Sequence, residues 1–185
     1  GDGKLVWRFL QDGEWKESSY TGEMWNGKAH GRGVEVWTDG SRYEGEFKNG
    51  MMNGRGTLNA VTRGRYEGGF QNDMQHGRGV VTYLNGDEYD GEYKDGKRHG
   101  RGAYLWASGT RYEGGFKDGK EHGHGVKLWV KGDRYEGAWR EGKPNGKGTL
   151  SGAGETLNGF WTNGCLQQGD RKVSVVTSLE ACDFE

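Results

Sequence analysis

Four histidines recur in a His-Gly step and are the side chains best suited to metal chemistry: His30, His76, His99 and His122. Imidazole is a common zinc ligand, so such a row first suggests a metal site. If the 23 residues between His76 and His99 form one β-hairpin, however, two strands of about 4.8 Å each separate the rings. Such rings cannot share one ion. We interpret these histidines as hydrogen-bonding residues of turns and predict no metal there.

The two cysteines are the other candidate ligands. Cys165 and Cys182 lie seventeen residues apart, which is not a recognised zinc spacing. We therefore expect no cofactor, with zinc at a dimer contact, held by these cysteines and a nearby His or Asp, as the alternative. So few cysteines also favour an intracellular protein over a secreted scaffold.

Catalytic and nucleotide-binding patterns are not evident. No Ser/His/Asp or Cys/His arrangement stands out, and Gly-x-Gly steps such as residues 31–33 do not follow a strand and open a helix, as phosphate-binding loops do. Net charge is −1, from 26 basic and 27 acidic residues, so the overall balance does not indicate nucleic acid. We predict a protein that is not an enzyme and binds no nucleic acid.

The elements that position these residues follow from a strict period. Six tyrosines stand 23 residues apart: Tyr20, Tyr43, Tyr66, Tyr89, Tyr112 and Tyr135. Such a period indicates one supersecondary unit copied along the chain. Aromatic residues, 12% of the chain, keep this register, which argues against the disorder that a hydrophobic content of only 31% would favour.

Each 23-residue repeat has the pattern of two short antiparallel strands. In residues 42–48 (RYEGEFK) apolar and charged residues alternate, residues 33–37 are rich in β-branched and aromatic side chains, and Asx-Gly pairs such as Asn49-Gly50 are typical of hairpin turns. The predicted fold class is all-β: an elongated, single-layer antiparallel meander sheet of hairpin repeats, curved and twisted. Gly45 and its equivalents leave room for an aromatic ring.

The phrase Tyr-x-Gly-x-aromatic, then Gly, then His-Gly-x-Gly, resembles the MORN repeat (membrane occupation and recognition nexus) over residues 20–169. The resemblance implies hairpins with an aromatic-lined groove and no enzymatic activity. Residues 164–185 resemble the end of MORN scaffolds of protist parasite cytoskeletons, which implies a cytoplasmic, cytoskeleton-associated protein. The sequence departs from the pattern at Asp73 (for the turn Gly), Asn53 and Asn145 (for His), and Ala60 and Gly152 (for the second-strand aromatic).

The period also divides the chain. We expect a degenerate N-terminal half-repeat (1–19), six MORN repeats (20–156), a degenerate seventh repeat (157–169) and a C-terminal capping or dimerisation tail (170–185).

The first candidate site is the aromatic groove. Its rings must form the core, but a one-layer sheet is expected to leave one side of them uncovered, and an apolar stripe rimmed by charge is typical of a protein-binding surface. The predicted groove residues are Tyr43, Phe47, Tyr66, Phe70, Tyr83, Tyr89, Tyr93, Trp106, Tyr112, Phe116, Trp129, Tyr135 and Trp139.

The second candidate site is a basic row that could meet anionic lipid: Arg32, Arg55, Arg78, Arg101 and Lys147. An opposing acidic row (Glu44, Glu67, Asp90, Glu113 and Glu136) favours solvated, self-neutralised charges instead. We therefore expect weak membrane binding.

The third candidate site is the C-terminal end, where a degenerate strand precedes a tail whose apolar residues have no repeat to pack into. The residues are Leu157 and Trp161 of the strand and Val173, Val175, Leu179 and Phe184 of the tail. They could cap the last strand or join two chains in a closed homodimer, and the resemblance favours the dimer. We therefore predict a scaffold that binds protein partners. The alternatives are a phosphoinositide-binding module and a targeting domain of a larger enzyme.

Overall fold

Strands form the whole regular structure of this protein in a computed structural model that describes residues 2–11, 14–175 and 182. No helix occurs among those residues, and successive strands of the repeats pair antiparallel with their neighbours in sequence. The predicted all-β meander of hairpins is therefore confirmed. The chain divides into two compact units, residues 1–96 and residues 97–185, which are described separately below.

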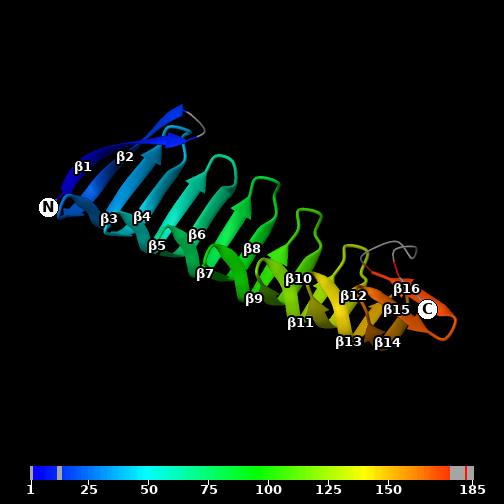
Figure 1. Ribbon diagram of the computed structural model, residues 1–185. Helices are drawn as coiled ribbons and strands as arrows, with labels where there is room; N and C mark the ends of the chain where they lie inside the picture. The colour runs from blue at the N-terminus through cyan, green and yellow to red at the C-terminus, as the bar shows by residue number, and fades with distance from the viewer. Residues whose placement is uncertain (1, 12–13, 176–181, 183–185) are drawn as a thin grey trace. The chain divides into compact units, whose positions relative to one another are not determined.

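The first unit is a meander whose strands lie side by side in chain order (Figure 1). β1 and β2 pair without a register shift from Asp2↔Glu23 to Gln11↔Glu14, so residues 14–19 belong to a regular strand. The strands of this unit are β1 (Asp2–Gln11), β2 (Glu14–Trp25), β3 (Lys28–Trp37), β4 (Arg42–Lys48), β5 (Met51–Ala60), β6 (Gly64–Gln71), β7 (Met74–Tyr83) and β8 (Glu88–Lys94).

The second unit continues the same hairpin pattern and ends in a separate two-stranded sheet formed by its last two strands. Its strands are β9 (Lys97–Leu105), β10 (Arg111–Lys117), β11 (Lys120–Leu128), β12 (Arg134–Arg140), β13 (Lys143–Gly152), β14 (Glu155–Trp161), β15 (Cys165–Gln168) and β16 (Arg171–Ser174).

A β-bulge lies opposite the tyrosine-bearing strand in the hairpins of the repeats. Between the pairs Gly45↔Gly56 and Phe47↔Met52, the single β4 residue Glu46 faces residues 53–55 of β5, so the extra residues belong to β5. A bulge leaves a backbone group outside the ladder, and buried polar groups need partners. The Tyr43 hydroxyl donates to the Glu46 carbonyl at 3.0 Å, and all six repeated tyrosines donate to the residue three positions on, at 2.6–3.1 Å.

Tight turns join the two strands of each repeat, and they also join repeats to one another. Asn49 and Gly50 both have positive φ (54° and 88°), as the Asx-Gly pair predicts. The Gly50 amide donates to the Ala29 carbonyl of the preceding hairpin at 2.8 Å. Where Asp73 replaces the turn glycine, it still adopts φ 65°, and its carboxylate accepts a hydrogen bond from the Met52 amide at 2.7 Å.

The core of each unit is a ladder of edge-to-face aromatic rings. In the first unit, consecutive centroids lie 4.9–5.2 Å apart through Tyr20, Phe47, Tyr43, Phe70, Tyr66, Tyr93 and Tyr89. In the second unit, the spacing is 5.1–5.3 Å through Phe116, Tyr112, Trp139, Tyr135 and Trp161. This geometry is the preferred one for aromatic pairs. The degenerate seventh repeat thus supplies the last ring of its ladder, Trp161.

The C-terminal hairpin of β15 and β16 covers the end of the second unit. Leu166, only 3% exposed, lies against Gly159 of β14, and Trp161 is fully buried. The Gly164 amide donates to the Pro144 carbonyl at 2.8 Å. Because β15 pairs with β16, the boundary expected between residues 169 and 170 falls in the turn of this hairpin.

Candidate protein-binding face

The period of two residues per strand gives each unit two different faces. In β4, Tyr43, Gly45 and Phe47 point to the side of the ring ladder, which we call the inner face. Glu44 and Glu46 point to the opposite side, the outer face. A site on either face is therefore assembled from alternate residues of neighbouring strands.

The predicted exposure of the ring ladder is wrong. Ten of the predicted groove residues are at most 5% exposed: Tyr43, Phe47, Tyr66, Phe70, Tyr89, Tyr93, Tyr112, Phe116, Tyr135 and Trp139. The Tyr43 ring lies against glycines of two strands, Gly45 and Gly56, and ladder neighbours flank it. The rings of Tyr66, Tyr112 and Tyr135 lie against glycine pairs in the same way. A single sheet can therefore cover these rings without a second layer, and they are core.

The remaining aromatic residues of the inner face stay accessible. Tyr83 in the first unit and Trp106 and Trp129 in the second are half-buried, as is Trp37, which occupies the same repeat position. Trp106 packs against Tyr104 with centroids 4.6 Å apart. These side chains, rather than the ladder, form the accessible aromatic surface.

A half-buried lysine lies among these tryptophans in the second unit. The Lys127 ammonium nitrogen is 4.1 Å from the Trp106 ring centroid, 5.9 Å from that of Trp129 and 5.7 Å from that of Trp139. It also forms an ion pair with Glu121 at 3.5 Å, and both side chains are only 14–16% exposed. Burial lowers the pKa of Lys127, and Glu121 opposes that shift. An indole box with a carboxylate thus holds a cation.

A buried acid occupies the corresponding repeat position in the first unit. Glu35 is 9% exposed, and Ser18, which hydrogen-bonds it, is 3% exposed. Burial raises the pKa of the Glu35 carboxyl, and the Ser18 hydrogen bond partly offsets that rise. Sequence reasoning missed Glu35, Lys127 and Glu121. The signal was present, because Leu58, Val81 and Leu150 occupy the position of Glu35 and Lys127 in other repeats.

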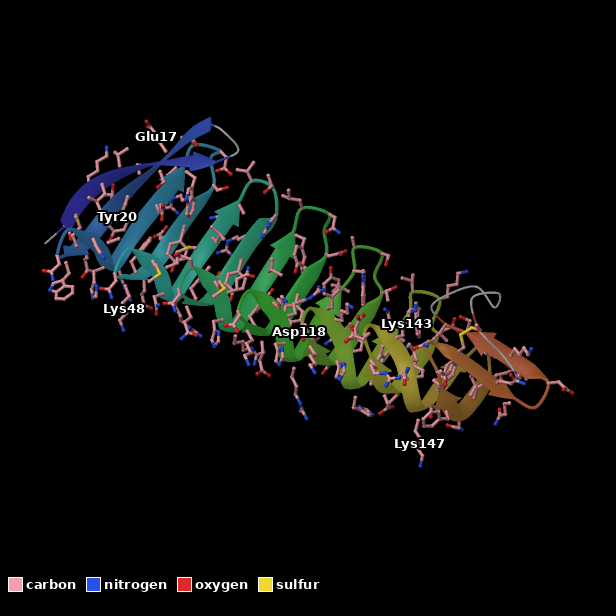
Figure 2. The ribbon with its side chains drawn as sticks, in the orientation of Figure 1. Glu17, Tyr20, Lys48, Asp118, Lys143 and Lys147 are labelled. Carbon is pink, nitrogen blue, oxygen red and sulfur yellow. A yellow bond between two sulfur atoms is a disulfide. The ribbon has the colours of Figure 1, made fainter. Side chains whose placement is uncertain are left out.

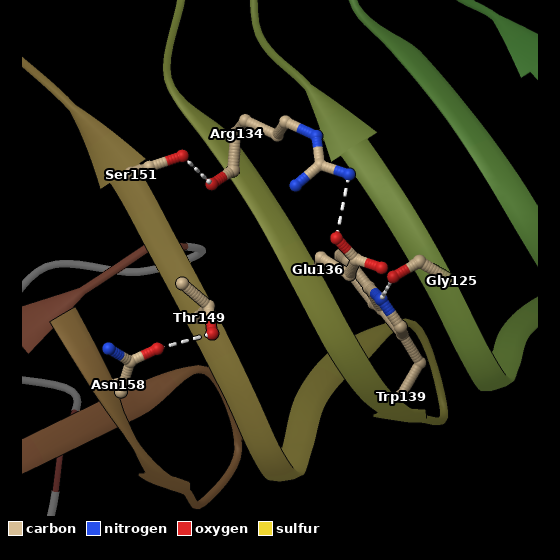
Figure 3. Close-up of polar contacts among 7 residues, drawn as sticks. All are labelled: Gly125, Arg134, Glu136, Trp139, Thr149, Ser151 and Asn158. Atoms are coloured by element: carbon tan, nitrogen blue, oxygen red, sulfur yellow. Dashed lines mark hydrogen bonds and ion pairs between the residues drawn. The ribbon is translucent and has the colours of Figure 1, made fainter. Parts of the chain in front are cut away.

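Most carboxylates of the acidic row on the outer face are paired with arginines of the same strand. Four Arg-Tyr-Glu steps form ion pairs of 2.7–3.0 Å between the residues that flank the tyrosine: Arg42–Glu44, Arg65–Glu67, Arg111–Glu113 and Arg134–Glu136. Figure 3 shows the Arg134–Glu136 pair and, separately, the hydrogen bond from the Trp139 indole N–H to the Gly125 carbonyl at 3.1 Å. Asp90 lacks such an arginine and pairs with Arg78 at 3.2 Å.

The predicted basic row is exposed. Its members are Arg32, Arg55, Arg78, Arg101 and Lys147, and Figure 2 shows Lys147 pointing away from the ribbon. A depression of about 420 Å³ in the first unit is lined by Arg32 and Arg55 but also by Glu44 and Glu46. The accessible cations there are accompanied by carboxylates, so lipid binding stays a prediction.

The histidine row lies beside the turns, with a different hydrogen-bond pattern from the predicted one. His76 Nδ1 is 3.6 Å from the Asp95 carboxylate of the next turn, beyond hydrogen-bond distance. Nδ1 of His30, His76 and His122 is buried without a hydrogen-bond partner. At the same position, Asn53 and Asn145 do donate to turn residues, Asn72 and Asn163, at 3.4 and 3.2 Å.

The two cysteines form a disulfide with Cα atoms 5.9 Å apart. While this bond is intact neither sulfur is a thiolate, so zinc at a dimer contact stays a hypothesis for the reduced protein only. Among the described residues, no group of three His, Cys, Asp or Glu side chains could hold a metal ion.

The predicted dimer end is partly sealed within the chain itself. Trp161 is buried, whereas Leu157, Val173 and Val175 are half-buried. Leu179 and Phe184 lie outside the described residues. Phe160, which the sequence reasoning did not include, is 67% exposed on the last strand of the repeats.

These features define a class of protein: an all-β repeat array whose inner face carries a sealed ring ladder beside accessible tryptophans. The MORN repeat model matches residues 20–42, 43–59, 66–88, 89–111, 112–134 and 135–155, so the chain belongs to the MORN-repeat family. The predicted resemblance is confirmed. The MORN repeat is a non-catalytic module of protein and lipid interaction. Comparison with curated proteins found no matching relative. In the described part of the chain, no helix is long and apolar enough to cross a membrane.

Proposed function

We propose that this protein is a non-enzymatic scaffold that binds protein partners through the accessible aromatic residues of its inner face. The observation that carries the proposal is the position of Trp106 and Trp129, half-buried beside a ladder that is itself sealed. Tryptophan is enriched among the residues that dominate binding energy at protein interfaces. The buried ladder forms the core, whereas the exposed parts of Trp106 and Trp129 can contact a partner protein.

The charge pattern supports a protein partner over a membrane or nucleic acid. The acidic row of the outer face is largely paired with arginines of the same strands. Net charge is −1. A cytoplasmic, cytoskeleton-associated location belongs to the same proposal and rests on the family resemblance of the C-terminal residues.

The test compares inner-face variants with outer-face variants that are adjacent in sequence. Trp106→Ser and Trp129→Ser should reduce capture of partners by the full chain about tenfold or more, since each removes a large aromatic contact. Leu105→Ser and Leu128→Ser are matched controls, because these residues are 41% and 47% exposed on the outer face. Circular dichroism confirms the fold of each variant. Equal loss in both pairs would contradict the proposal.

Homodimerisation through the C-terminal end is a second part of the proposal. Phe160 offers an exposed ring on β14, and Leu157 of the same strand and Val173 of β16 are half-buried. Two identical ends that meet form a closed contact. Light scattering at tens of micromolar should give a dimer for the intact chain and a monomer for Phe160→Lys. A monomeric intact chain would contradict the dimer.

A further inference from the structure

The missing aromatic residue of the sixth repeat leaves a cleft in the second unit. Gly152 stands at the repeat position of Trp106 and Trp129. Beside it lies a cavity of about 420 Å³, which we call the Gly152 cleft. It is lined by Trp129, Asp133, Leu150, Gly152, Glu155, Leu157, Arg171, Val173, Ser174 and Val175.

The cleft exists because the connection between β13 and β14 is shorter than its counterpart one repeat earlier. Only Ala153 and Gly154 separate these two strands, with φ of 49° and 82°, whereas residues 129–133 separate β11 from β12. The chain therefore turns back before it reaches the place that a longer connection would fill. The Gly152 position faces Asp133, since a Cβ atom there would overlap the Asp133 carboxylate.

At this shorter turn, a hydrogen bond that is formed at the same repeat position in the first unit is absent among the described residues. Ser41 occupies the repeat position of Asp133 in the first unit, and its hydroxyl accepts a hydrogen bond from the Val61 amide of the next connection at 3.2 Å. Within residues 2–11, 14–175 and 182, the Asp133 side chain forms no hydrogen bond or ion pair. A partly buried carboxylate thus faces the cleft without a partner in the described chain.

The lining selects a cation with an aliphatic stem. Glu155 pairs with Arg171, which leaves the Asp133 charge uncompensated. The indole of Trp129 adds a surface that attracts cations, and Leu150, Leu157 and Val173 provide apolar walls. An anionic ligand would be repelled, and a neutral apolar one would leave Asp133 desolvated and unpaired.

The same chemistry is already present one repeat earlier. There the chain's own Lys127 ammonium lies against Trp106 and pairs with Glu121. The Gly152 cleft has the corresponding indole, Trp129, and a carboxylate from a different repeat position, Asp133. Its lining residues supply no cation other than Arg171, which is paired.

We propose that the Gly152 cleft binds a lysine or arginine side chain presented by a partner protein. The inference rests on the proposed role as a protein-binding array and names the chemistry that one of its sites recognises. The ammonium or guanidinium pairs with Asp133, and its aliphatic stem packs against Trp129 and Leu157.

The experiment uses the full chain with ¹⁵N-labelled tryptophan and four blocked pentaglycine-based peptides that carry lysine, arginine, norleucine or glutamate at the centre. The Trp129 indole resonance should shift in a saturable way with the lysine and arginine peptides. The norleucine peptide, which keeps the stem but lacks the charge, should bind about tenfold more weakly or not at all. This comparison needs no variant, so it holds even if a substitution in the cleft disturbs folding.

Asp133→Asn should weaken binding of the lysine peptide about tenfold. Asp170→Asn, which removes the same charge from the exposed turn between β15 and β16, should not. Equal binding of the lysine and norleucine peptides, or unchanged binding by a folded Asp133→Asn variant, would overturn the inference. Loss of partner capture in Trp106→Ser with no lysine-peptide binding would refute this inference alone. Peptide binding with capture unaffected by Trp106→Ser would instead refute the proposed function.

Discussion

The hydroxyl of Tyr112 donates a hydrogen bond to the carbonyl of Gly115, 2.9 Å away and three residues further along the same strand. The register between β10 and β11 shifts at Gly115, which has no paired residue in β11, so one side chain both fills the core and hydrogen-bonds a backbone carbonyl at this β-bulge. The ring reaches this carbonyl by crossing the glycine pair Gly114 and Gly125, where a Cβ atom would meet it.

Gly125→Ala should therefore destabilise the protein. A Cβ atom at residue 125 would lie 2.5 Å from Tyr112 Cζ, and the fully buried ring has no space to move into. Overpacking of this kind costs about 1–3 kcal/mol. Urea unfolding measures it, with Gly119→Ala as the control: nothing lies near its Cβ position, so that variant reports only the cost of positive φ. Gly125 has no positive φ of its own, so an unchanged free energy of unfolding for Gly125→Ala would show that ring contact is unimportant.

The ion pair of Lys127 and Glu121 should be strongly coupled. Removal of either partner alone leaves a buried charge without its counterion and should cost about 3 kcal/mol. The double variant Lys127→Met/Glu121→Gln should lose less than the sum of the single losses. The pKa of Lys127 is lower in the folded protein than in the unfolded chain. Its titration therefore contributes fully to the free energy of unfolding only above the unfolded-state pKa, and this contribution is lost as the pH falls through the folded-state pKa. Additive single losses in a double-mutant cycle would contradict the coupling.

The ladder tyrosines should limit stability at high pH. Burial raises the pKa of Tyr66 and of Tyr135 to about 12, against about 10 in the unfolded chain. Because the pKa is higher in the folded state, the two tyrosines contribute fully to the free energy of unfolding below a pH of about 10, and this contribution is lost as the pH rises through about 12. Phenolate absorbance should therefore show the ladder tyrosines ionising together with unfolding. Ionisation of all nine tyrosines near pH 10 with the fold intact would refute this.

Most of the fold could be predicted from the sequence because the period is carried by residues with strong local preferences. The Tyr-x-Gly step predicts the strand and Asn49-Gly50 predicts the turn, and both were right. The bulge of β5 opposite Glu46 could not be predicted, since the repeat pattern does not show that three residues of β5 lie against one residue of β4.

The candidate site was predicted less well for a related reason. Ring exposure depends on how neighbouring repeats interlock, which a strand pattern does not show. The position of Lys127 could have been found by comparing repeats, because a charge replaces the aliphatic residues Leu58, Val81 and Leu150 on an inner-face row. The sequence shows that Gly152 replaces the aromatic residue of other repeats. That Asp133 lies unpaired beside it could not be predicted, because this depends on the geometry of the turn between β13 and β14.

Membrane binding should be weak and electrostatic. Each basic residue contributes only about 1 kcal/mol near an anionic surface, and Arg78 is paired with Asp90. Co-sedimentation with phosphatidylserine or phosphoinositide vesicles at physiological salt should recover little protein, and Arg55→Ala/Arg101→Ala should recover less. Robust pelleting that resists high salt would contradict this prediction and favour a lipid-binding module.

Oxidative footprinting of the full chain, with and without a purified partner, measures directly whether partners contact the inner face beside the sealed ladder. We expect the partner to protect Trp106 and Trp129 from oxidation, with no change at the buried Trp139 or at Leu105 and Leu128 on the outer face. Protection of Leu105 and Leu128, with Trp106 and Trp129 labelled as in the free protein, would contradict this expectation.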